Sequence, residues 1–385
     1  MYNYRVRTYK IGDTMKKLIS LFLILISILA LASCGGGDYP PVKSNDVESQ
    51  TVMTISLEGK KYEVKYELYR ALFLNLRESV DNGDSSVWSG EKKDEYIEKI
   101  DALIKGKVTD IYSVLHVAKK VGIDPYSKDF DKQVKAFIEV SVEGGYYDED
   151  KIIGFDGDYD KYLASLKEMN LNYSVQDLII RYHLASEKLF EYYAGYLHGE
   201  FIEETVKGAL EYTAEDVKAF YESDECVRVL TLYLPKANFT KERAEQIRED
   251  VIEASTYGDD AVATLMTNMG NPEIAASEVF RGSLIGRHNL DSAFSGDMEN
   301  VAFALSPFGV SEVLSVNDGY EDSYVILYRA LKSDTVFEEN RNYFTSEYVQ
   351  NEIGKIIDTA ADAMEEGLTV SELLFELDRS NISMD

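Results

Sequence analysis

The side chains that most often carry enzyme chemistry are scarce in this sequence. It has four histidines in 385 residues, and none is spaced i, i+4 from another, the spacing typical of a helical metal site. They are His116, His183, His198 and His288. No serine occupies a G-x-S-x-G motif, and there is no glycine-rich phosphate loop. The sequence therefore offers no support for a hydrolase or a nucleotide-binding enzyme, and we expect no metal and no cofactor.

The two cysteines differ in what they can do. Cys226 begins a strand-like apolar run and is interpreted as a small packed residue. Cys34 ends a segment in which two lysines precede an apolar run, Leu18 to Leu31, that is too short for a comfortable membrane span. The residues around it, Leu31-Ala32-Ser33-Cys34, resemble the lipobox of bacterial lipoproteins. In that family the cysteine thiolate takes up the lipid and becomes the first residue after cleavage.

This resemblance implies a secretion signal and a lipid anchor. We expect a lipoprotein signal peptide over residues 15–33, a lipid on Cys34 and a flexible tether over residues 34–50. Residues 1–14 precede the charged start of the signal and are interpreted as an upstream over-extension. An ordinary signal peptide with a chance cysteine is disfavoured, because glycines 35–37 follow at once. The chain is then expected outside the cytoplasm, anchored to the bacterial cell membrane.

Composition narrows the possible partners. The net charge is −29. Because a surface this acidic repels nucleic-acid phosphates, we expect no nucleic-acid partner. The charge is interpreted as serving solubility. Hydrophobic residues make up 45% and aromatic residues 12%, which are globular values. The 28 tyrosines either fill helix faces or form an adaptable binding surface, and both interpretations remain open.

The periodicity of apolar residues predicts an α+β protein that is mostly helical. Strands are expected only in the first residues after the tether and within 227–328. A small α+β segment is thus inserted between two helical regions that must pack on one another, because neither has a complete core of its own. The predicted boundaries are 51–223 for the N-terminal helical region, 224–333 for the inserted segment and 334–385 for the C-terminal helices.

Helix-capping residues locate several of the predicted helices. Ser127 can cap a helix whose apolar residues begin at Phe130. Ser174 with Asp177, and Thr213 with Asp216, have the spacing of a capping box. The acidic stretch 144–160 is predicted to be a surface loop, and the tail after residue 368 to be one short helix.

Three segments together resemble a known family. They are IYSVLHVAKKVGIDPYSKDFDKQVKAF at 111–137, YTAEDVKAFYES at 212–223 and MENVAFALSPFGVSEVLSVNDGY at 298–320. In this order they are similar to the extracytoplasmic foldases of the PrsA and SurA type. The resemblance implies a SurA-N-like chaperone domain, formed by the N- and C-terminal parts, with an inserted parvulin-type (PpiC-like) peptidyl-prolyl isomerase domain at 224–333.

The third segment suggests where a substrate pocket would lie. In parvulins a pocket lined by aromatic rings holds the substrate proline, and two histidines support a hydrogen-bond network beneath the twisting peptide bond. By the resemblance, substrate-binding residues are Leu284, Phe294 and Met298, with Phe303 in the core helix. The histidine positions fall on Thr231 and Tyr324, so no catalytic residue is assigned. Tyr324 is expected to fill part of the proline site.

Three functions follow from this. The first is a lipid-anchored foldase or chaperone that binds unfolded or newly secreted polypeptides and has a weak or inactive isomerase domain. The second is an active peptidyl-prolyl isomerase, in which the apolar pocket compensates for the replaced histidines. The third is a surface lipoprotein that binds one dedicated partner. Turnover of a prolyl peptide separates the first two functions, and a survey of clients separates the first from the third.

The anchor is directly testable. Replacing Cys34 by Ala removes the thiolate that takes up the lipid. We expect the variant either to leave the membrane fraction or to accumulate as an unprocessed precursor, measured by fractionation and mass spectrometry. An Ala variant that is still lipidated would contradict the assignment.

Overall fold

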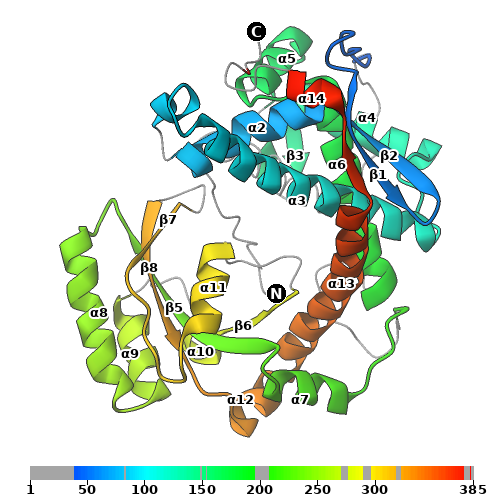
Figure 1. The fold of residues 1–385 in the computed structure, drawn as a ribbon. Coiled ribbons are helices and arrows are strands. Elements are labelled where there is room, and N and C mark those ends of the chain that lie inside the picture. Colours follow the sequence, from blue (N-terminus) through cyan, green and yellow to red (C-terminus); the bar gives the residue numbers. More distant parts are fainter. Residues whose placement is uncertain are drawn as a thin grey trace. The chain divides into compact units, whose positions relative to one another are not determined.

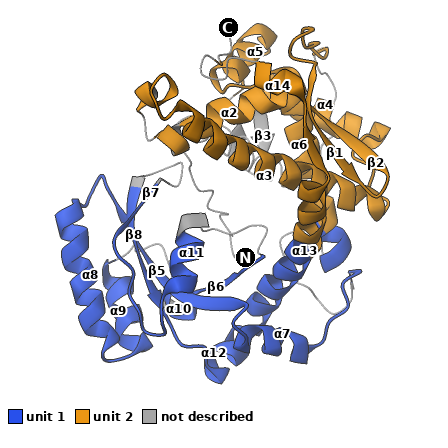
Figure 2. Ribbon diagram, in the orientation of Figure 1, with its two compact units in different colours: residues 1–19, 190–355 blue, residues 20–189, 356–385 orange. Residues whose placement is uncertain are grey.

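A computed structural model describes residues 39–81, 84–147, 150–152, 154–195, 208–269, 276–288, 296–317, 322–376 and 382. It combines helices with small antiparallel sheets, so the predicted α+β class is confirmed (Figure 1). The chain divides into two compact units (Figure 2). The described residues of unit 1 lie between 190 and 355, and those of unit 2 lie up to residue 189 and again from 356 onwards.

Unit 2 holds the first half of the chain and the C-terminal end. Its elements are β1 (Thr51–Leu57), β2 (Lys60–Lys65), α2 (Tyr66–Asp81), η2 (Ser85–Trp88), α3 (Lys93–Lys120), α4 (Lys128–Glu143), β3 (Gly145–Tyr147), β4 (Asp150–Ile152), α5 (Tyr159–Glu168), β9 (Leu368–Val370) and α14 (Glu372–Glu376). Helices α6 (Tyr173–Ala194) and α13 (Arg341–Glu366) each contribute residues to both units.

The C-terminal end returns to the first strand. The three-stranded sheet of unit 2 has the order β2-β1-β9, and Met53 pairs with Val370. The predicted short helix of the tail is present as α14, but the prediction missed β9, which forms because the open edge of β1 offers the segment a ladder of hydrogen bonds. The predicted loop 144–160 also contains the hairpin of β3 and β4 and the start of α5. Strands are thus not confined to the predicted regions.

The predicted helix caps are confirmed at two of three sites. The Ser127 side chain accepts a hydrogen bond from the backbone N–H of Phe130, and Thr213 forms a complete capping box with Asp216. The third prediction is wrong. Asn172 caps α6 by accepting from the Val175 N–H at 2.9 Å, and the hydroxyl of Ser174 donates instead to Glu67. A buried carboxylate competes successfully for that hydroxyl.

Residues 39–50 belong to unit 2 and form hydrogen bonds with its other residues, contacts that the prediction of a flexible tether did not include. Glu48 accepts a hydrogen bond from the guanidinium of Arg70, and the Tyr66 N–H donates to the Gln50 carbonyl at 2.8 Å. The phenol of Tyr159 donates to the Pro40 carbonyl at 2.8 Å. The bond between Arg70 and Glu48 is charge-assisted, and such a bond can order a segment that has few apolar residues.

The predicted signal peptide and Cys34 lie outside the described residues. Among the helices that the structure describes, none is both long enough and apolar enough to cross a membrane.

Unit 1 is built around a four-stranded antiparallel sheet of order β6-β5-β8-β7. Its elements are α7 (Ala214–Glu222), β5 (Cys226–Pro235), α8 (Lys241–Ser255), α9 (Asp259–Met269), α10 (Ala276–Arg281), β6 (Ser283–Gly286), α11 (Gly296–Ala304), β7 (Leu314–Asn317), β8 (Asp322–Arg329) and α12 (Asp334–Glu339). Helices α8 and α9 pack on one face of the sheet and α11 on the other (Figure 1). The predicted insert, 224–333, falls within this unit.

A buried arginine joins the elements of this sheet. Arg228 on β5 is 1% exposed, and its Nη1 lies 3.0 Å from Oδ2 of Asp259, the first residue of α9. The same guanidinium donates to three backbone carbonyls. They belong to Phe280, Arg281 and Leu331. Asp259 also accepts from the Tyr328 hydroxyl at 2.7 Å, so both charged groups are well supplied with partners.

The stability of unit 2 should depend on pH through His116 in α3. This side chain is 2% exposed, and its Nδ1 lies 2.8 Å from the Tyr62 hydroxyl. Burial, helped by Lys60, lowers the pKa of His116 below the value of about 6.5 that it has when unfolded. The unfolded chain therefore binds a proton that the folded chain does not, and stability should fall as pH drops through about 6.5. Burial lowers the pKa of His183 to about 3, which acts in the same direction.

We expect thermal unfolding of unit 2 at lower temperature at about pH 5.5 than at about pH 7.5. His116→Gln keeps a polar group beside Tyr62 but cannot titrate, so its unfolding temperature should change less over this range, with His183 supplying the remainder. The matched control is His288→Gln in unit 1, which should leave the pH dependence of the unfolding temperature of unit 2 unchanged. If the unfolding temperatures of the wild type and of His116→Gln changed equally with pH, this account would be contradicted.

Candidate functional site

The face of the sheet that carries α11 holds Met298, one of the residues that the resemblance implies for a substrate pocket. Side chains alternate between the two faces along a strand. On β5, Val227 and Val229 lie in the cluster that contains Met298, and Tyr233 packs against it. Met298 itself is 1% exposed, so its side chain is sealed in this core and does not line an open surface. The resemblance implied that Met298 binds substrate, but in α11 its side chain contacts the protein's own strands.

Thr231 lies on this same face by the alternation of β5, and it pairs across the ladder with Leu327, a member of the Met298 cluster. Its Oγ1 atom is buried and has no hydrogen-bond partner. The side chain stands where the resemblance implies a histidine, and a threonine hydroxyl can supply neither the charge nor the second ring nitrogen of an imidazole.

Tyr324 lies on the opposite face. It pairs with Leu234 across the ladder and packs against the core formed with α8 and α9. The ammonium of Lys236 lies 5.4 Å from the centre of its ring. The expectation that Tyr324 fills part of a pocket beside Met298 is therefore wrong, because strand alternation turns its side chain to the other face. Thr231 and Tyr324 are not brought together.

Leu284 is also turned away from Met298. It is 2% exposed and packs in a third cluster, together with residues of α7, α12 and α13. The next residue, Ile285, is the one that joins the Met298 cluster. The sequence interpretation was one residue out of step, and the alternation of the short strand Ser283–Gly286 is the signal that identifies Ile285.

Phe303 packs against the Met298 cluster, as predicted for the core helix. The guanidinium of Arg287 lies 4.0 Å from the centre of its ring, a cation–π contact that the sequence did not predict. Arg329 donates to the carbonyls of Phe303 and Leu305, so it fixes the end of this helix. Phe294 lies outside the described residues.

Cys226 and the backbone of His288 have structural roles in unit 1. Cys226 is buried, and burial raises the pKa of its thiol to about 11, so it stays protonated at neutral pH. Its interpretation as a packed residue is confirmed. The backbone N–H of His288 donates to Oδ1 of Asn351 at 3.1 Å, which ties the turn after β6 to α13. Among the described residues, no group of three acidic, histidine or cysteine side chains could hold a metal ion.

The unpartnered hydroxyl of Thr231 gives a stability prediction. Replacing Thr231 by Val keeps the shape of the side chain and removes the buried polar atom, which should stabilise unit 1 by about 1 kcal/mol. The control is Thr267→Val, because the hydroxyl of Thr267 donates to the Ala263 carbonyl at 2.7 Å. Denaturant unfolding should show the first variant more stable and the second not. Loss of stability in Thr231→Val would mean that the hydroxyl has a partner.

Comparison with known proteins adds only distant likenesses to solved structures. No family model matches the chain, and no curated protein matches it. One similar solved structure is the foldase protein PrsA from Streptococcus pneumoniae str. Canada MDR_19A, with 17% identity, 80% of this chain and 92% of that chain covered, and a TM-score of 0.26. Another is the foldase protein (PrsA) from Lactococcus lactis, with 14% identity, 87% and 100% covered, and a TM-score of 0.23. Likenesses at these scores support no statement about the function of this chain.

Proposed function

We propose that this protein is an extracytoplasmic foldase or chaperone, held on the cell membrane by a lipid on Cys34, which binds unfolded or newly secreted polypeptides. In this proposal unit 1 contributes a parvulin-like domain that is weak or inactive as an isomerase. The clients are bound through apolar and aromatic side chains and need no metal, cofactor or nucleic acid.

The arrangement of the predicted pocket residues is the observation that carries the weak-isomerase part of the proposal. The two positions implied for histidines hold Thr231 and Tyr324, whose side chains lie on opposite faces of the sheet. Leu284 and Met298 are sealed in two different cores. A prolyl isomerase must hold the prolyl ring in a dry pocket and stabilise the twisted amide, and these side chains do not converge on such a pocket.

Exposed apolar side chains on unit 2 support the binding part. Leu103, Tyr126 and Phe375 are 46%, 53% and 64% exposed. Tyr126 also lies under the guanidinium of Arg181, 5.5 Å from its ring centre. Broad aromatic and aliphatic groups of this kind can contact the apolar stretches of an unfolded chain without demanding one sequence.

The test measures turnover and binding on the same preparation. We expect residues 35–385 to accelerate isomerisation of a prolyl tetrapeptide only slightly, while suppressing aggregation of a denatured secreted protein. The double variant Leu103→Ser, Phe375→Ser should weaken the suppression, because it removes exposed apolar area.

The matched control is Lys132→Ser, Lys167→Ser, which alters two exposed polar positions of the same unit. This control variant should suppress aggregation to the same extent as the wild type does. Robust isomerase turnover would favour the active enzyme instead. Binding of a single folded protein, with no effect on denatured clients, would favour a dedicated surface lipoprotein.

A further inference from the structure

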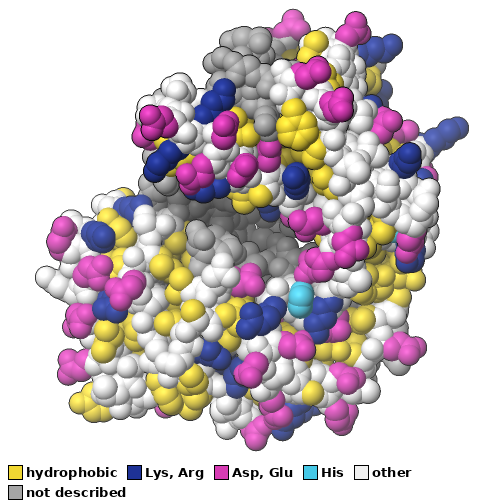
Figure 3. All heavy atoms as spheres, in the orientation of Figure 1, with side chains coloured by type: hydrophobic (Ala, Val, Ile, Leu, Met, Phe, Trp, Pro, Cys, Tyr) yellow, Lys and Arg dark blue, Asp and Glu magenta, His cyan; other side chains and the backbone are white. Residues whose placement is uncertain are grey.

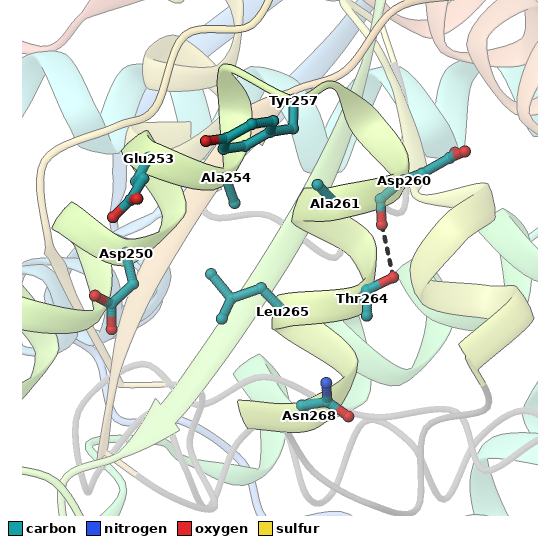
Figure 4. Close-up of a pocket in the computed structure, with 9 residues that line it drawn as sticks. All are labelled: Asp250, Glu253, Ala254, Tyr257, Asp260, Ala261, Thr264, Leu265 and Asn268. Carbon is teal, nitrogen blue, oxygen red and sulfur yellow. Dashed lines mark hydrogen bonds between the residues drawn. The ribbon is translucent and has the colours of Figure 1, made fainter.

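A shallow groove lies between α8 and α9 of unit 1, on the side of these helices away from the predicted pocket face (Figure 4). Its volume is about 680 Å³. Leu265, Ala254 and Ala261 provide apolar surface, and the ring of Tyr257 stands at one end. Tyr257 is 77% exposed, the largest exposure among the large hydrophobic residues described. An aromatic ring so exposed has apolar area available for a ligand.

Three carboxylates surround this apolar floor. They belong to Asp250, Glu253 and Asp260, and none of them has an ion pair among the described residues. No lysine or arginine lines the groove. The other side of α8 is different, because Arg248 there pairs with Glu312 at 2.9 Å and donates to the Ser311 carbonyl. Around α8 and α9, Figure 3 shows acidic, apolar and basic side chains side by side, so the lack of a basic residue is particular to the lining of the groove. The groove therefore lacks the positive charge that would balance its rim.

Helix α3 shows how a cation binds where an aromatic ring and a carboxylate lie side by side. On α3 the ammonium of Lys99 lies 4.9 Å from the centre of the Tyr96 ring and 2.7 Å from a carboxylate oxygen of Glu95. A cation placed against both a ring face and a carboxylate gains from both attractions. The groove has the ring and the carboxylates, and the cation must come from outside.

We infer that the α8–α9 groove docks cationic, apolar segments of unfolded polypeptide chains. A lysine or arginine side chain lies over Tyr257 between the rim carboxylates, and an aliphatic side chain one or two residues away packs on Leu265. This deepens the proposed function by naming a class of client segment, and it places a binding site away from the predicted pocket. Because the rim is exposed, the binding should be weak and sensitive to salt.

The test uses a capped, fluorescently labelled peptide of alternating lysine and leucine, titrated with residues 35–385 at about 20 mM and about 150 mM salt. We expect saturable binding that weakens at the higher salt. The neutralising variant Asp250→Asn, Glu253→Gln, Asp260→Asn should bind about tenfold more weakly. Tyr257→Leu should also bind more weakly, and Tyr257→Phe, which keeps the ring, should bind like the wild type.

The control variant carries the same change of charge away from the groove: Glu245→Gln, Glu278→Gln, Glu339→Gln. Equal weakening in this control and in the neutralising variant would overturn the site, since net charge alone would then explain the binding. Equal binding of a peptide with glutamate in place of lysine would overturn the ligand class. Self-association of the protein through the groove, detected by sedimentation and lost in Tyr257→Leu, would assign the surface to a second copy and overturn the proposal.

The two proposals fail in different ways. If aggregation of denatured clients is suppressed but the cationic peptide does not bind, the groove assignment is wrong and the chaperone function stands. If the peptide binds but no denatured client is protected, the groove is a binding site without the proposed function.

Discussion

The ion pair between Arg228 and Asp259 is the constraint on which unit 1 depends. A guanidinium that is 1% exposed is costly unless its N–H groups are paired, and here a carboxylate and three backbone carbonyls accept from it. These partners come from α9, from the end of α10 and from the segment after β8. The charge therefore ties the central strand β5 to three later parts of the chain, and both faces of the sheet are ordered around it.

Once β5 is fixed, alternation along the strands decides which core each side chain joins. A shift of one residue moves a side chain from one face to the other, and this is where the sequence interpretation failed. Met298 and Phe303 do join one core, because a helix presents a broad face that tolerates a small error, but Met298 is buried there and does not line a substrate pocket. Leu284 and Tyr324 lie on strands, and both side chains pack in cores other than that of Met298. On the strand of Leu284, the residue that packs beside Met298 is Ile285. A resemblance between whole segments does not determine which face of a strand each side chain occupies.

The fold was predictable where the signal is local. Ser127 and the Thr213 capping box identify helix starts from residues three positions apart, and the structure has both. It was not predictable where the partner is distant. β9 exists because residue 370 meets residue 53, and residues 39–50 are ordered because Glu48 meets Arg70. Neither segment has an apolar pattern strong enough to predict its structure by itself, so a local interpretation assigns it to a helix or a tether.

The contact between α13 and β6 shows that the four-stranded sheet does not end at the predicted boundary, residue 333. A Cβ atom at Gly354 would lie 1.5 Å from the His288 carbonyl oxygen, and one at Gly286 would lie 2.4 Å from Oδ1 of Asn351. Helix and strand can approach this closely only because both positions lack a side chain. Phe344 on the same helix covers Leu284 in the third core. Since Leu284 is buried by residues beyond 333, the sheet and the first half of α13 form one packing unit, and any change that loosens the helix also exposes the edge of the sheet.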